Sequence, residues 1–90
     1  MKSYVLSKEQ LEEIVIDALS EFFKMSLSLN DPDVYEELCS YHGYPNKDEY
    51  IIDENELRDL MVLAMKYVGV TEDLFESDYA EFVSTLDEVQ

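Results

Sequence analysis

The sequence predicts a mainly α fold: a small four-helix domain made of two similar helix pairs. Three observations support this prediction. Ninety residues are the length of a single domain. Hydrophobic residues make up 47% of the chain, including seven Tyr and four Phe, which is too apolar for a disordered acidic segment. Finally, the second half of the chain resembles the first. We therefore expect one folded, acidic helical domain over residues 1–90.

Two copies of one pattern, residues 1–43 and 47–88, are related by an offset of 46 positions. Residues 4–11 (YVLSKEQL) align with residues 50–57 (YIIDENEL), and the register continues as far as Leu19 and Met65. Each copy begins with an aromatic and two aliphatic residues, followed by a helix cap and a helix. Self-similarity of this kind indicates one supersecondary unit used twice.

The start of each copy carries two local signals. A Ser or Asp stands three residues before a Gln or Glu, which is the spacing of a capping box, in Ser7 with Gln10 and in Asp53 with Glu56. The triplets just before them, residues 4–6 and 50–52, are rich in β-prone side chains. We expect these triplets to be extended and to pair as a short two-stranded ribbon.

The first copy predicts two helices. The first covers about residues 8–27, and its apolar positions are spaced three and four apart: Leu11, Ile14, Val15, Ala18, Leu19, Phe22 and Phe23. Asn30-Asp31-Pro32 then places Pro in the first turn of a second helix. This helix covers about residues 32–41 and is expected to bury Val34, Tyr35 and Leu38. Gly43 is expected to end it in the left-handed conformation.

The second copy follows a turn-rich connection, residues 44–48, and also predicts two helices. The helix over about residues 54–68 is apolar nearly all round, which predicts the most buried element of the fold, and Gly69 ends it. Thr71 caps a last helix over about residues 72–88. This helix is expected to bury Leu74, Phe75, Tyr79, Phe82, Val83 and Leu86.

The charge balance indicates which partners suit the chain. Twenty-two Asp and Glu face six Lys and Arg, a formal net charge of −16. Nucleic acids and anionic membranes are bound through Lys and Arg, so we expect neither direct nucleic-acid binding nor membrane binding. A basic protein surface would be attracted, above all that of a nucleic-acid-binding protein or a nuclease. The sequence leaves a homodimer open.

Compartment and redox signals are sparse. Cys39 is the only cysteine, which excludes an intramolecular disulfide and a zinc cluster. The first residues lack the apolar segment of a signal peptide, and no apolar run approaches the roughly 20 residues of a membrane span. We therefore expect a cytoplasmic protein, or one in the host cytoplasm if a phage encodes it.

A row of acids on the first predicted helix is the main candidate site. Glu9, Glu13, Asp17 and Glu21 are spaced four apart and so line one stripe. Each like-charge pair at that spacing costs about 0.2–0.5 kcal/mol, or roughly 1 kcal/mol for three pairs. An ordinary solvated face mixes the two signs, and adaptation to high salt is a further explanation for the surplus of acids. Against the latter, the chain keeps Lys over Arg and many large apolar residues.

We take the acids around this row, together with two neighbouring tyrosines, as the predicted partner-binding surface. Tyrosine offers contact area and a hydrogen-bonding group at interfaces, although Tyr41 has an equally good alternative as a core residue. The predicted surface comprises Glu9, Glu12, Glu13, Asp17, Glu21, Asp31, Asp33, Glu36, Glu37, Tyr41, Tyr44, Asp48, Glu49, Asp53 and Glu54.

Catalysis, metals and cofactors are not expected. With Glu56 or Glu81 at the last position of an EF-hand loop, Tyr50 or Phe75 falls where that loop requires Gly. His42 is the only histidine and lies three residues from Cys39, which is a spacing that a catalytic thiol–imidazole pair could use. A helix end with a buried cysteine is the commoner arrangement, so we expect that instead. The two glycines form no phosphate-binding loop.

The small apolar core, acidic coat and missing catalytic set resemble the DNA-mimic inhibitors made by phages and other mobile elements. That resemblance rests on charge and size, and it implies a non-enzymatic protein that occupies the nucleic-acid groove of a target, as anti-restriction and anti-CRISPR proteins do. One alternative is an immunity protein or antitoxin that neutralises a basic nuclease toxin. Another is a structural or regulatory adaptor, in which an apolar groove binds a helix and the acidic surface is incidental.

Overall fold

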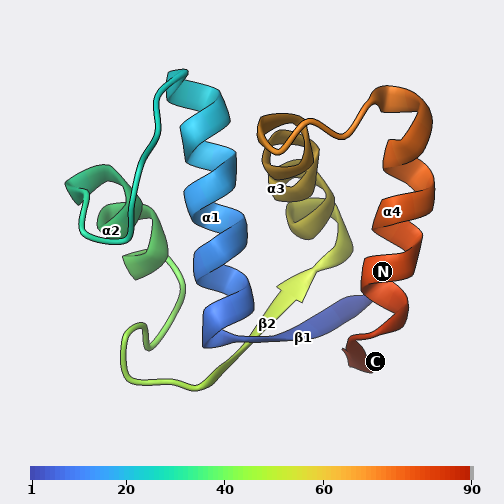
Figure 1. Cartoon of the computed structure of the whole chain (residues 1–90). Coiled ribbons are helices and arrows are strands. Elements are labelled where there is room, and N and C mark those ends of the chain that lie inside the picture. The colour runs from blue at the N-terminus through green and yellow to red at the C-terminus, as the bar shows by residue number, and fades with distance from the viewer. Residues whose placement is uncertain (90) are drawn as a thin grey trace.

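The structure, a computed structural model, describes residues 1–89 and is mainly helical with a small antiparallel sheet (Figure 1). Helices account for 57% of the chain. In chain order the elements are β1 (Ser3–Ser7), α1 (Lys8–Phe23), α2 (Pro32–Cys39), β2 (Glu49–Asp53), α3 (Glu54–Tyr67), α4 (Glu72–Ser84) and β3 (Asp87–Val89).

The predicted two-stranded ribbon is confirmed, but the sheet has a third strand. β1 pairs antiparallel with β2 on one side and with β3 on the other. β3 forms where the last helix was predicted to continue to residue 88. That helix ends at Ser84, because the amides of Thr85 and Leu86 bond back to the carbonyls of Phe82 and Val83. The fold is therefore mixed α/β rather than purely helical.

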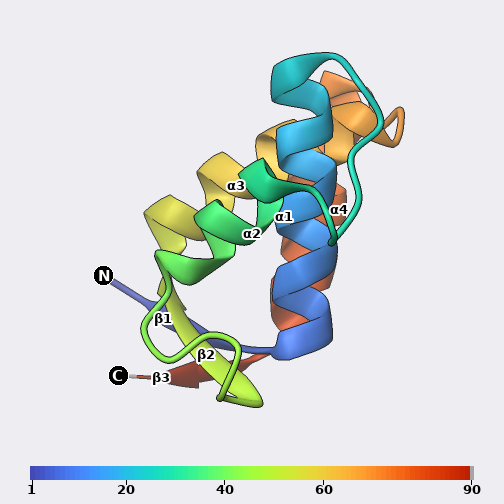
Figure 2. The ribbon, with the colours of Figure 1, turned by 90° about the vertical axis from the view of Figure 1, so that its left-hand side faces the viewer.

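The pairing of β1 with β2 is unchanged when each residue is exchanged for the one 46 positions away. Val5 pairs with Ile51, and Tyr4 pairs with Ile52 as Leu6 does with Tyr50. The flanking hydrogen bonds exchange in the same way: the Lys8 amide donates to the Asp48 carbonyl at 2.8 Å, and that of Glu54 to Lys2 at 2.9 Å. Both helices consequently leave the same side of the ribbon and pack against each other. Figure 2 shows the strands gathered at one end of the molecule.

The starts of α1 and α3 follow the predicted caps, whereas Thr71 precedes α4 without a side-chain cap bond. The Ser7 hydroxyl accepts from the Gln10 amide at 3.1 Å, and the Gln10 side chain accepts from the Ser7 amide at 2.8 Å, which completes a capping box. At the start of α3, the Asp53 carboxylate accepts from the Glu56 amide at 2.9 Å. Both partners of each of these bonds lie within three residues of sequence.

The core lies between α1, α2, α3 and the inner face of the ribbon. α1 supplies more of it than α3 does, so the prediction that α3 is the most buried element is wrong. The physical reason is position: α1 contacts α2, α3 and two strands, whereas α3 buries only Leu57, Met61 and Ala64. α4 has no buried residue, and Leu74, predicted to be buried, is 56% exposed.

α1 ends at Phe23, four residues earlier than predicted, because Ser20 redirects the chain. Lys24 takes a left-handed conformation with φ of 56°, and the Met25 amide donates to the Ser20 carbonyl. The buried Ser20 hydroxyl accepts from the Leu27 amide at 3.0 Å. As a result Phe22 and Phe23, predicted to be in the core, are 65% and 44% exposed.

Replacing Ser20 with Ala is expected to destabilise the fold by about 1 kcal/mol, because the Leu27 amide loses its acceptor. Urea unfolding followed by circular dichroism measures the change. Ser26→Ala, at an exposed position of the same segment, is the matched control and is expected to shift stability by less than about 0.5 kcal/mol. Equal losses in the two variants would contradict the role assigned to Ser20.

α2 is also shorter than predicted, ending at Cys39 with Ser40 as a right-handed cap. Gly43 does have a positive φ, of 86°, but it lies in the following turn, where its carbonyl accepts from the Asn46 amide. Tyr35, predicted to be buried, is 49% exposed. α3 ends within one residue of its predicted end, and Gly69 follows with φ of 94°.

Candidate functional site

Acidic side chains dominate three of the four helices. α1, α2 and α4 carry five, three and five Asp or Glu residues, and their only base is Lys8, at the first position of α1. Within residues 1–89 the ion pairs are Lys2–Glu88, Lys24–Glu21 and Arg58–Glu76. Only two of these thirteen helix acids are therefore neutralised inside the chain.

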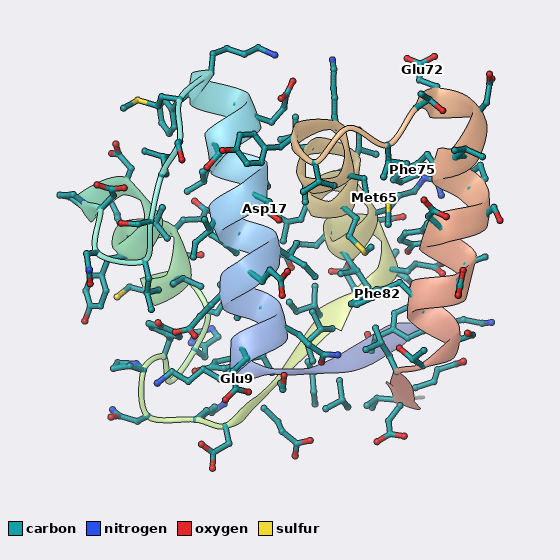
Figure 3. All side chains as sticks on the ribbon, in the orientation of Figure 1. Glu9, Asp17, Met65, Glu72, Phe75 and Phe82 are labelled. Atoms are coloured by element: carbon teal, nitrogen blue, oxygen red, sulfur yellow. The ribbon has the colours of Figure 1, made fainter. Side chains whose placement is uncertain are left out.

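The predicted row on α1 forms a single stripe along the helix. Figure 3 shows Glu9 near the sheet end and Asp17 further along. Glu9 and Glu13 are exposed, whereas Asp17 and Glu21 are partly buried, and Glu21 accepts a hydrogen bond from Lys24 at 2.5 Å. Partial burial and, second, the charge of Glu13 raise the pKa of the Asp17 carboxyl. The fold therefore disfavours the ionised form of Asp17, and a nearby cation would stabilise that form.

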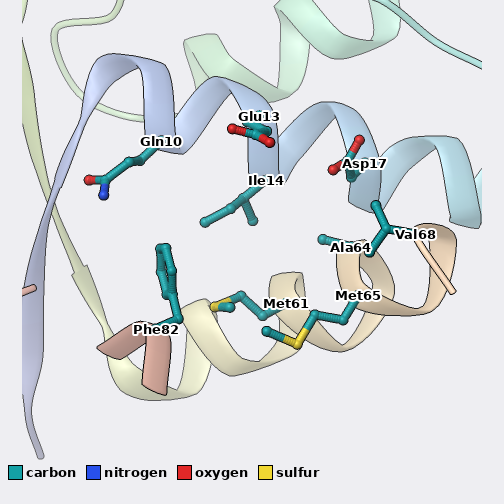
Figure 4. A pocket seen from close by; sticks show the side chains of 9 residues that line it. All are labelled: Gln10, Glu13, Ile14, Asp17, Met61, Ala64, Met65, Val68 and Phe82. Carbon is teal, nitrogen blue, oxygen red and sulfur yellow. The ribbon is translucent and has the colours of Figure 1, made fainter. Parts of the chain in front are cut away.

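The middle of this stripe borders a groove of about 220 Å³ between α1, α3 and α4. Its floor is apolar and comes largely from α3, and Phe82 of α4 forms the opposite wall. In Figure 4, Ile14 points into the groove while Glu13 and Asp17 stand along its α1 edge. The α3 residues that line it are Met61, Ala64, Met65 and Val68, the last just after the helix.

Glu12 lies beside the stripe but is occupied within the chain. The Tyr44 hydroxyl donates to its carboxylate at 2.5 Å. Lys8 lies over the Tyr44 ring, 5.2 Å from its centroid, and donates to the Pro45 carbonyl at 2.9 Å. Burial and the bond to Glu12 raise the pKa of Tyr44. Glu12 therefore fastens the loop before β2 to α1.

The tyrosines predicted to meet a partner are mostly internal. Tyr41 is only 9% exposed and belongs to the core, which was the alternative expected for it. Burial, followed by the nearby Glu56, raises its pKa. Tyr44 is half-buried between Tyr35 and Tyr50, with ring centroids 6.2 and 6.1 Å away. These rings secure α2 and its loop to the sheet.

The acids of α2 border a second hollow, of about 410 Å³. Asp33, Glu36 and Glu37 line it together with Phe22 and Phe23. Asp31, just before the helix, instead closes a turn, because its carboxylate accepts from the Ser28 amide at 2.6 Å. Sequence reasoning missed both hollows, since it placed the two Phe rings in the core and the α3 surface under other helices.

The remaining predicted residues lie at the sheet end of the molecule. Asp48 and Glu49 are exposed at the start of β2. Asp53 caps α3, and the Glu54 carbonyl accepts from the Tyr79 hydroxyl at 3.5 Å. The structure thus brings part of the α1 row to one groove and the α2 acids to another, and leaves this group at the strands.

Comparison with known proteins gives no match: no family model, no curated protein and no solved structure is similar to this chain. No group of three or more metal-ligating side chains occurs among the described residues. No helix within residues 1–89 is long and apolar enough to cross a membrane. Cys39, expected to be buried beside His42, is exposed at the end of α2.

Proposed function

We propose that this chain is a non-enzymatic acidic protein that occupies the basic nucleic-acid-binding surface of a target protein. One observation carries the proposal. Thirteen carboxylates lie on α1, α2 and α4 against a single base, and ion pairs within residues 1–89 neutralise two of them. Self-repulsion of this kind destabilises a small domain, and a cationic partner would relieve it.

The spacing of the α1 row suits a surface that binds phosphates. Residues four apart on a helix rise by about 6 Å, close to the roughly 7 Å of duplex axis taken by two successive phosphates of one DNA strand, at about 3.4 Å each. From Glu9 to Glu21 the row spans about 18 Å. Such a field would also steer encounter with a basic partner, most strongly at low salt.

Competition with DNA tests the proposal. The immobilised chain is used to capture proteins from a cell lysate at low salt, and the captured partner is purified. Duplex DNA is then titrated against the complex. The partner is expected to be released by DNA, and also by raising salt from about 50 to 300 mM, because both compete with the carboxylates. A partner that resists both would contradict the proposal.

The nature of the captured partner decides between two uses of the same surface. A restriction, CRISPR, repair or transcription protein would identify a counter-defence mimic. A nuclease that is inhibited by the chain and toxic without it would identify an immunity protein.

A further inference from the structure

We propose that the groove between α1, α3 and α4 binds an amphipathic helix of the partner, with an apolar stripe flanked by Lys and Arg. This inference depends on the proposed function for the positive charge of the partner. It adds that the partner docks through a helix and that this helix lies in the groove.

The groove exposes apolar surface that the helices of the chain leave uncovered. α1 and α4 lie on either side of α3 (Figure 1), and α4 packs on α3 without burying any residue completely. Apolar surface consequently stays open on the floor and on the α4 wall: Val68 is 61% exposed, and Met65 and Phe82 are only partly buried. Methionine side chains adapt readily to differently shaped apolar partners.

The charge around this floor selects the kind of helix. Glu13 and Asp17 stand on the α1 edge, and none of the described residues that line the groove is basic. On α4, Asp78 precedes Phe82 by four residues and so lies on the same side of that helix. Apolar residues on the floor and cations against both edges are the complement of this surface. A second copy of this chain, with a net charge of −16, would be repelled.

Two synthetic peptides of about 14 residues, or about 21 Å as helices, provide the probe. Both contain equal numbers of Leu and Lys. In one the Leu residues form a single helical stripe, and in the other they are distributed all round. At about 0.1 M salt the striped peptide is expected to bind at least about tenfold more tightly, because only it can place Leu on the groove floor and Lys at its edges.

The variants locate the binding site. Met65→Gln combined with Val68→Thr is expected to remove most of the preference for the striped peptide. Val68→Thr alone, at an exposed position, is expected to reduce it and serves if the double variant folds poorly. Val62→Thr, exposed and part of a different hollow, is the matched control, and Phe22→Gln tests the hollow beside α2. Both are expected to bind like the parent chain.

The methionine methyl signals in NMR give an independent readout. The chain has four Met residues; Met61 and Met65 line the groove, whereas Met25 is exposed beyond the end of α1. The striped peptide is expected to shift the signals of Met61 and Met65 and to leave Met25 unchanged. Shifts at Met25 alone, or loss of binding in Phe22→Gln, would overturn the groove assignment.

The outcomes separate this inference from the proposed function. If the two peptides bind equally and only at low salt, the groove inference is wrong while an electrostatic partner surface stands. If neither binds, the groove inference is again wrong, and release of the captured partner by DNA decides the proposed function separately. Striped-peptide binding that is insensitive to salt would contradict the flanking Lys and Arg of the inferred helix, and the proposed function would still be decided by release of the captured partner.

Discussion

Replacing Glu9, Glu13, Asp17 and Glu21 together with their amides is expected to stabilise the fold while weakening capture of the partner. Three like-charge pairs disappear, each worth about 0.2–0.5 kcal/mol. The lost Glu21–Lys24 pair offsets about one such increment, so the net gain is roughly 0.5–1 kcal/mol. Affinity for the partner should nevertheless fall about fourfold or more, since four ion pairs with the partner contribute about 0.2–1 kcal/mol each.

The stability gain of this amide variant should depend on pH, and the pKa of Asp17 determines in which direction. Its pKa is raised in the fold by partial burial and by Glu13, so the folded chain favours the protonated carboxyl. The stability contributed by the protonated Asp17 carboxyl is fully present below the ordinary aspartate pKa of 3.8. It is lost as pH rises through the higher pKa of the folded chain. The advantage of the amide variant should therefore be largest near neutral pH and vanish toward about pH 3. Urea unfolding at both pH values measures it.

A variant with the same reduction in charge provides the control. Glu56, Asp59, Asp87 and Glu88 are exposed acids that lie outside α1, α2 and α4 and outside the predicted partner-binding surface, and the corresponding amides remove the same four charges. Both variants weaken the general field, but only the α1 variant removes the proposed contacts, so it should lose more affinity. Equal losses would mean that the row acts through net charge alone, and unaltered capture by the α1 variant would place the contact elsewhere.

Leu11→Ala and Leu57→Ala are each expected to destabilise the fold by about 2–5 kcal/mol. Both side chains are fully buried, and each is the first buried residue of its helix, α1 or α3. A domain of this size has a total stability of about 5–13 kcal/mol, so either change removes a large part of it. Because the two positions are 46 residues apart, copies that pack equivalently should lose similar amounts.

Chemical unfolding followed at the helical circular dichroism band measures both losses. Leu74→Ala is the control: the same truncation at a side chain that is 56% exposed should cost less than about 1 kcal/mol. A loss below about 1 kcal/mol at Leu11 or Leu57 would contradict the packing described for that helix. Losses differing by more than about 2 kcal/mol would show that the two copies are not equivalent in energy.

Much of the fold could be predicted because its signals are local. The capping residues Ser7 and Asp53 lie three residues from the amides they accept from, so the starts of α1 and α3 are readable from spacing alone. The ends of the helices were harder to predict from the sequence. The end of α1 depends on the bond from Leu27 to Ser20, and the end of α4 is followed by pairing with β1, whose residues lie far away in the sequence.

The candidate site divides in the same way. Spacing by four aligns Glu9, Glu13, Asp17 and Glu21 on any helix, and the structure has them on one stripe. The grooves beside the stripe could not be predicted, because an apolar side chain such as Met65 looks the same in sequence whether or not another helix covers it. Tyr41, proposed as a partner contact, is buried, whereas Phe22, proposed as a core residue, is 65% exposed.

The sequence by itself determined the surplus of negative charge, the stripe on α1, the helix starts and the strand pairing of the two similar segments. The first three follow from composition and from interactions across a few residues, and the strand pairing follows from the similarity of the two segments. Only the tertiary structure decided which apolar residues are covered, since burial depends on how far each helix extends and on which neighbour packs against it. α4 rests on α3 without closing over it, and this arrangement leaves an apolar floor open beside the acids of α1.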